Sequence, residues 1–115
     1  MPTRIYHNPR CSKSRQTLAL LQEHHVDAEI VEYLQTPPDK QELEQLLTLL
    51  KLEPRQLMRT GESEYKELGL DNPSLSHEAL VEAMVSHPKL IERPIVIHNG
   101  KAIIGRPPEK VLDIL

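Results

Sequence analysis

One cysteine, Cys11, is present among the 115 residues of the chain. It lies in the stretch IYHNPRCSKSRQTL, directly after Arg10 and before a Ser-Lys-Ser-Arg run. A helix N-terminus and nearby cations lower the pKa of a thiol from about 8.5, which makes it a nucleophilic thiolate near neutral pH. The free N–H groups of a first helical turn also cradle an oxyanion. A lone cysteine is often only a small buried apolar residue, but these polar and cationic neighbours favour a reactive thiol.

His7 precedes this thiol by four residues, and its imidazole is a candidate for orienting or stabilising the thiolate. The alternative is that it is simply a solvated loop histidine. The remaining histidines include the adjacent pair His24 and His25 and show no HExxH-like spacing. Because a structural zinc site takes several close ligands and a disulfide takes two cysteines, we expect neither a metal nor a disulfide.

Two arginines are predicted to meet at the open end of a hairpin. The segment RPIVIHNGKAIIGR has two β-rich runs joined by Asn-Gly, the strongest short hairpin signal. Counting outward from this turn pairs Arg93 with Arg106. Facing like charges destabilise a sheet unless an anion neutralises them, and arginine forks suit oxyanions. The alternative is that both side chains point into solvent or pair with acids such as Glu92 and Glu109.

The elements that must position these residues alternate along the chain. Strands are predicted in TRIYH and AEIVEY, on either side of a helix from Ser12 to about His24. A helical region follows, with an Asp39 cap before QELEQLLTLLKL, short helices in PRQLMR and SEYKELGL, and a longer helix capped by Ser76. The hairpin and a last helix after Pro107 and Pro108 complete the chain. The order indicates an α/β fold around a mixed sheet whose first two strands are parallel.

Composition favours a single globular domain over residues 1–115. Hydrophobic residues make up 38% of the chain, but Phe and Trp are absent, so the core must be aliphatic. Few aromatic rings and a net charge of -3 argue against nucleic-acid binding. No stretch approaches the roughly 18 apolar residues of a membrane span, no signal-peptide run is present, and cysteine usage fits a reducing compartment. We expect a cytoplasmic monomer that does not bind membranes.

Long motifs are distributed from end to end of the chain: YHNPRCSKSRQTL, YLQTPP, LMRTGESEYKELGL, HPKLIERPIVI and GRPPEKVLDIL. In this order they resemble the glutaredoxin-linked arsenate reductase (ArsC) family, which is related to Spx-like regulators. The resemblance implies a thioredoxin-like fold with a mixed four-stranded sheet, in which a helical region is inserted between β-α-β and β-β-α. It also implies a cis peptide bond at Pro94.

The same resemblance implies roles for individual residues. Cys11 would be the catalytic thiolate, with His7 in a supporting role. Arg59, Arg93 and Arg106 would hold the oxyanion substrate. From the residues alone, Arg59 in LMRTG is interpreted as a helix-end arginine near carbonyl groups, so its assignment depends on the motif match.

The implied reaction is the reduction of arsenate to arsenite through a covalent Cys11 adduct, with no bound cofactor. Because the chain has no second cysteine, the resemblance implies that glutathione attacks the adduct and that glutaredoxin clears the resulting mixed species. Phosphatase-like arsenate reductases instead shuttle disulfides among their own cysteines, and they carry an arginine where this chain has Thr17.

An Spx-like adaptor that binds RNA polymerase without reductase activity is the alternative. Those regulators usually carry CxxC, whereas the fourth position here is Ser14, which removes a disulfide switch. Some family members also extend past the equivalent of Leu115, so the chain resembles a short member of the family.

Overall fold

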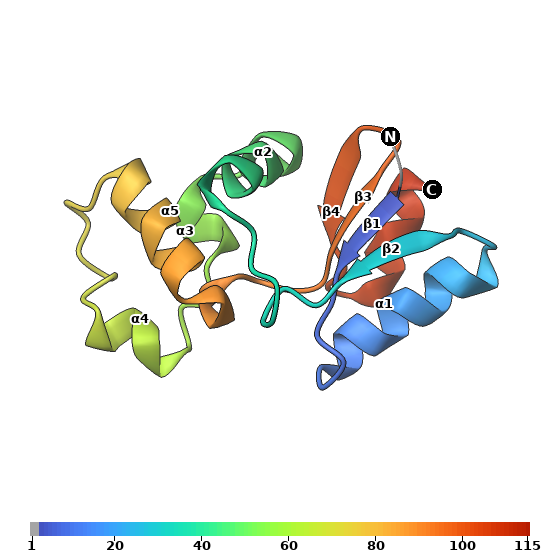
Figure 1. The fold of residues 1–115 in the computed structure, drawn as a ribbon, viewed down its shortest axis with the longest axis horizontal. Helices are drawn as coiled ribbons and strands as arrows, with labels where there is room; N and C mark the ends of the chain where they lie inside the picture. Colours follow the sequence, from blue (N-terminus) through green and yellow to red (C-terminus); the bar gives the residue numbers. More distant parts are fainter. Residues whose placement is uncertain (1–2) are drawn as a thin grey trace. The chain divides into compact units, whose positions relative to one another are not determined.

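The computed structural model describes residues 3–115, so Met1 and Pro2 of the expected domain lie outside the described residues. The chain forms two compact units. The first runs to Thr36 and resumes at Arg93, and the second comprises Pro37–Glu92 (Figure 1). The second unit is therefore an insertion between the β-α-β part and the β-β-α part of the first.

A mixed four-stranded sheet forms the centre of the first unit. Its strands are β1 (Thr3–Tyr6), β2 (Ala28–Val31), β3 (Ile95–His98) and β4 (Lys101–Ile104), in the order β2-β1-β3-β4. Strand β1 pairs parallel with β2 and antiparallel with β3, and β3 pairs antiparallel with β4. This arrangement confirms the predicted α/β fold with a mixed sheet.

An aliphatic core joins the sheet to two helices of the first unit, α1 (Ser12–Glu23) and the 3₁₀ helix η2 (Pro108–Ile114). The strand register aligns Ile5 with Ile30 on one side and with Val96 on the other. Ile5 and Val96 are fully buried in one cluster with Leu21 of α1 and Val111 of η2. Burial of each such side chain contributes about 1.5–3 kcal/mol. The predicted C-terminal helix is present, but it has 3₁₀ rather than α geometry.

The hairpin between β3 and β4 has the predicted turn and register. His98 pairs with Lys101, and the ladder continues to Ile95 and Ile104. The turn residues Asn99 and Gly100 have φ of 51° and 75°, the left-handed values that an Asn-Gly turn supplies.

Beyond the last ladder pair, the chain continues in the same register for one step. The Gly105 N–H donates to the carbonyl oxygen of Pro94 at 2.9 Å. A Cβ atom on Gly105 would lie 2.6 Å from Oγ1 of Thr17 in α1 and 3.0 Å from Cγ of Pro94. The absence of a side chain at Gly105 thus lets the end of β4 approach α1 closely. The predicted cis bond before Pro94 is present, and a second one, not predicted, precedes Pro107.

The second unit consists of helices: α2 (Lys40–Leu50), α3 (Pro54–Leu57), α4 (Ser63–Glu67), α5 (His77–Ser86) and the 3₁₀ helix η1 (Pro88–Leu90). The predicted caps are confirmed. The Asp39 side chain accepts a hydrogen bond from the Glu42 N–H at 2.8 Å, and Ser76 accepts one from Ala79 at 3.1 Å.

An isolated antiparallel bridge between Met58 and Ile91 ties the end of α3 to the segment after η1. It is flanked by hydrogen bonds from the Arg59 N–H to Leu90 and from the Glu92 N–H to Leu57, at 2.7 and 2.8 Å. Within residues 3–115, no helix combines the length and apolar character needed to cross a membrane.

Candidate active site around Cys11

The thiol of Cys11 lies at the junction between the loop after β1 and helix α1. Cys11 is the N-cap residue of α1, with extended backbone angles, and its own N–H donates to the Asn8 carbonyl oxygen at 3.0 Å. The Asn8 side chain accepts from the Arg10 N–H, also at 3.0 Å, which closes the turn that precedes the helix. Cys11 is partly exposed and therefore accessible to a reactant.

The environment of this thiol favours the thiolate. Partial burial raises the pKa of Cys11, but the backbone N–H of Ser14, the charge of Arg93 and the N–H of Lys13 together outweigh burial, so the net pKa is lowered. A hydrogen-bonding contribution from the Arg93 side chain acts in the same direction. The cation responsible thus comes from the segment before β3, not from the basic residues that flank Cys11 in the sequence.

Buried hydrogen bonds among His7, Ser14 and Asn8 hold the loop that precedes Cys11. His7 Nδ1 and Ser14 Oγ are 2.6 Å apart, and the Asn8 N–H donates to the same Ser14 oxygen at 3.0 Å. Ser14 is fully buried in the first turn of α1, and His7 is only 6% exposed. Ser14 therefore connects His7 to the thiolate through its own backbone N–H. Sequence reasoning missed this role; the available signal was a small polar residue three positions after the nucleophile, in the first helical turn.

Burial lowers the pKa of His7 and so favours its neutral imidazole. Desolvation lowers the pKa of His7, the nearby carboxylate of Glu32 raises it, and the charge of Arg15 lowers it, with a net decrease. Within residues 3–115, the one side-chain hydrogen bond of His7 goes to Ser14 rather than to the thiol. The predicted support of the thiolate by His7 is thus indirect in this structure.

Two of the predicted arginines lie together in the first unit. Nη1 of Arg106 donates to the backbone carbonyl oxygen of Arg93 at 3.3 Å. Arg93 in turn contributes to lowering the pKa of Cys11. The Arg93 side chain thus acts on Cys11, and the Arg106 side chain contacts the backbone of Arg93.

The third predicted arginine, Arg59, belongs to the second unit. Its guanidinium pairs with the carboxylate of Glu62 and lies 3.7 Å from that of Glu92. The backbone of Arg59 is held by the bridge between Met58 and Ile91 described above. A role for Arg59 in binding the oxyanion stays a prediction.

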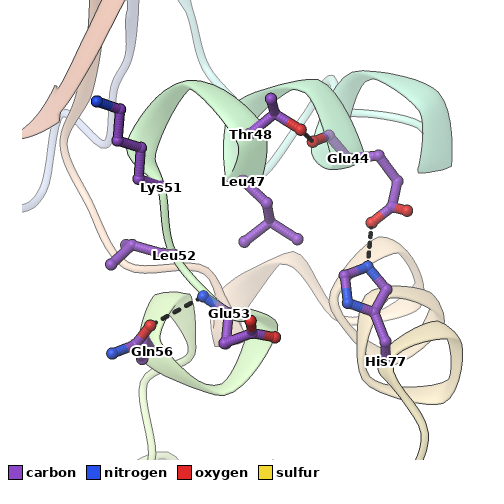
Figure 2. A pocket seen from close by; sticks show the side chains of 8 residues that line it. All are labelled: Glu44, Leu47, Thr48, Lys51, Leu52, Glu53, Gln56 and His77. Carbon is purple, nitrogen blue, oxygen red and sulfur yellow. Dashed lines mark hydrogen bonds and ion pairs between the residues drawn. The ribbon is translucent and has the colours of Figure 1, made fainter.

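The second unit contains a hollow of about 530 Å³ between α2, α3 and the start of α5 (Figure 2). Several of its polar side chains bond one another or the helix backbone. Glu44 accepts from His77 at 2.6 Å, Thr48 donates to the Glu44 carbonyl oxygen at 3.1 Å, and Gln56 accepts from the Glu53 N–H at 2.9 Å. Because these pairs fulfil the capping and bridging needs of the helices themselves, we assign no chemistry to this hollow.

The chain is similar to one protein family over almost its whole length. The model of the ArsC family matches residues 6–114. An arsenate reductase of Neisseria meningitidis serogroup A is 53% identical over 113 residues, which cover 97% of each chain. The Escherichia coli protein YfgD is 60% identical over 113 residues, 97% of this chain and 95% of its own length. The solved structure of an arsenate reductase from Vibrio cholerae is 54% identical, covers 100% of this chain and 98% of its own, and superimposes with a TM-score of 0.97.

Proposed function

Because the chain belongs to the ArsC family, we propose that it reduces arsenate to arsenite, with Cys11 as the nucleophile and glutathione as the co-substrate. The observation that carries the proposal is the lowered pKa of Cys11 beside Arg93, at the N-terminus of α1. A thiolate that attacks an anion needs neighbouring positive charge, because two negative groups otherwise repel each other. Arg93 and the first-turn N–H groups supply that charge.

In the first step, the Cys11 thiol replaces one hydroxyl group of arsenic acid, which gives Cys11–S–AsO(OH)₂ and water. The glutathione thiol then replaces a second hydroxyl group, which releases another water and leaves arsenic as As(V). A glutaredoxin thiol attacks the glutathione sulfur, so a mixed disulfide forms and the As–S electron pair reduces arsenic to As(III). Hydrolysis of Cys11–S–As(OH)₂ releases arsenite and restores the Cys11 thiol.

Each residue of the proposed site has its own role in these reaction steps. Arg93 favours the thiolate and faces the incoming anion, and Arg106, which is bonded to the Arg93 backbone, adds a second guanidinium fork. His7 supports the loop through Ser14. Arg59 is proposed as a third oxyanion ligand on the strength of the sequence motif. Glutathione and glutaredoxin are required because the chain contains no other cysteine.

The test supplies arsenate, glutathione and glutaredoxin to the purified protein and follows the formation of arsenite. We expect turnover by the wild type, none when glutathione is omitted, and none for Cys11→Ser. His77→Gln is the matched control, because His77 lies at the hollow of the second unit and should leave turnover unchanged. Wild-type protein that makes no arsenite but co-purifies with RNA polymerase would contradict the proposal and favour the adaptor function.

A further inference from the structure

A pocket of about 220 Å³ lies in the first unit beside the loop that carries Cys11. Strands β1 and β2 are parallel neighbours, so their carboxyl ends meet at the same edge of the sheet. The loops that follow them form the walls of the pocket. Its lining residues are His7, Asn8, Pro9, Arg10, Glu32, Leu34 and Gln35. We call this the thiol-loop pocket.

Two walls of the thiol-loop pocket present opposite charges. Arg10 lies on the loop after β1, and Glu32 lies on the turn after β2, where its carbonyl oxygen accepts from the Gln35 N–H at 2.9 Å. Both residues are exposed. Within residues 3–115, neither side chain makes a hydrogen bond or ion pair, not even with the other. A cation and an anion held apart on facing loops match a ligand that carries one charge of each sign.

An apolar surface completes the pocket between these charges. Leu34, which lines the pocket, is 41% exposed. The α-amino-acid end of a small molecule has a carboxylate for Arg10, an ammonium group for Glu32 and methylene groups for Leu34. The pocket is smaller than the roughly 300 Å³ at which whole-ligand sites begin, so it suits one end of a larger molecule.

We propose that the thiol-loop pocket binds the γ-glutamyl end of glutathione, with its α-carboxylate on Arg10 and its α-ammonium group on Glu32. This assignment rests on the proposed function, which makes glutathione the co-substrate. Because Cys11 directly follows Arg10 in the chain, a ligand bound to Arg10 would contact the same loop that carries the nucleophile. The bound thiol replaces a hydroxyl group on the arsenic atom attached to Cys11, and water leaves. No electron is transferred in that step.

The first experiment measures binding without turnover. S-methylglutathione, which cannot react, is titrated into the wild type and followed by amide chemical shifts. We expect the largest shifts at Asn8, Arg10 and Gln35. The dissociation constant should rise about tenfold or more in Arg10→Ala and in Glu32→Gln, because each change removes a charge-assisted contact. Lys110→Ala and Glu23→Gln are the controls, since these exposed residues lie outside the pocket.

The second experiment separates this proposal from the proposed function. In the arsenite assay, Arg10→Ala and Glu32→Gln should raise KM for glutathione about tenfold and change KM for arsenate less than about twofold. A normal KM for glutathione in both variants would overturn the pocket assignment and leave arsenate reduction intact. If the protein makes no arsenite at all, the binding titration decides: shifts confined to the pocket support the assignment, and their absence overturns it.

Discussion

The Nη1 of Arg106 donates a hydrogen bond to the carbonyl oxygen of Arg93 at 3.3 Å, two steps beyond the last pair of the β3–β4 ladder. The Arg106 guanidinium thus contacts the backbone of the residue whose own guanidinium lowers the pKa of Cys11. We therefore expect the two guanidinium groups to share one tetrahedral anion.

Sulfate provides a test of this shared site, because a ligand that binds only the folded state stabilises it by mass action. At about 100 times its dissociation constant, sulfate should stabilise the wild type by about 2.7 kcal/mol. The stabilisation should be much smaller in Arg106→Ala. Thermal melting with and without sulfate measures the difference. Lys101→Ala, which removes a cation from the turn end of the same hairpin, should respond like the wild type. Equal protection of Arg106→Ala would show that Arg106 does not bind the anion.

The pKa of the Cys11 thiol should lie below its ordinary value of about 8.5 and should rise in Arg93→Gln, because the positive charge of Arg93 favours the thiolate. The rate of alkylation as a function of pH gives both values. Arg10→Gln is the control. Although Arg10 is adjacent to Cys11, it is not among the groups that lower its pKa, and this variant should titrate close to the wild type.

A thiol with a lowered folded-state pKa also affects stability. Its contribution is present in full above the unfolded pKa of about 8.5 and is lost as the pH falls through the folded pKa. The free energy of unfolding of the wild type, relative to Cys11→Ser, should therefore increase as the pH rises toward about 9. Urea unfolding at several pH values measures this, and a difference that shrinks with rising pH would contradict the assigned sign.

Ser14→Ala should destabilise the fold by about 1–3 kcal/mol, because it leaves His7 Nδ1 and the Asn8 N–H buried without their shared partner. Ser12→Ala is the matched control: Ser12 is an exposed residue in the same helical turn, and its replacement should change stability by less than about 0.5 kcal/mol. Urea unfolding of both variants gives the comparison. Equal effects would mean that the buried hydrogen bonds contribute nothing to stability.

Gly105→Ala should cost about 1–3 kcal/mol, because the added Cβ would lie 2.6 Å from Oγ1 of Thr17, inside van der Waals contact. The end of β4 would have to move away from α1, and Arg106 with it. We therefore expect weaker protection by sulfate as well as a lower melting temperature. Gly61→Ala, where no atom lies within 4 Å of the new methyl group, should be nearly neutral.

We propose that residues 1–115 unfold as one domain, although the chain forms two compact units. Calorimetry should then show a single transition whose calorimetric and van't Hoff enthalpies agree. Leu80→Ala in the second unit and Val96→Ala in the first should each lower the temperature of that whole transition. Two separable transitions, each sensitive to one variant only, would identify two domains.

The local features of the fold were predictable because their signals are short-range. The Asn-Gly turn fixed the hairpin register out to Ile95 and Ile104, since side chains in a ladder alternate with a period of two. The helix caps at Asp39 and Ser76 were predictable for the same reason, because each cap bonds a backbone N–H only three residues away. The 3₁₀ geometry of η2 was not predictable, because prolines and leucines permit both helix types and packing decides between them.

The position of Cys11 at the start of a helix was predictable from the sequence, but the charged group that lowers its pKa was not. Sequence reasoning attributed the reactivity of Cys11 to the helix N-terminus and to the flanking cations. The N–H groups of Ser14 and Lys13 do lower the pKa of Cys11, but the side chain of Arg15 bonds the Pro9 carbonyl oxygen, and Arg93 supplies the positive charge. The interaction of Arg93 with Cys11 joins segments far apart in the chain, so it depends on the fold and cannot be inferred from the spacing of residues in the sequence. Likewise, Arg59 approaches Glu92 only because the chain reverses between α3 and η1, whereas its pairing with Glu62 is local.

The insertion of the second unit has a consequence for the newly synthesised protein. A ribosome adds Cys11 and α1 early, then the whole of Pro37–Glu92, and only afterwards Arg93 and β3. Until those later residues emerge and pair with β1, the nascent thiol lacks the arginine that favours its ionised form. We therefore expect nascent chains that end before Arg93 to react slowly with oxidants and alkylating agents. The reactivity of Cys11 then develops only as the sheet closes.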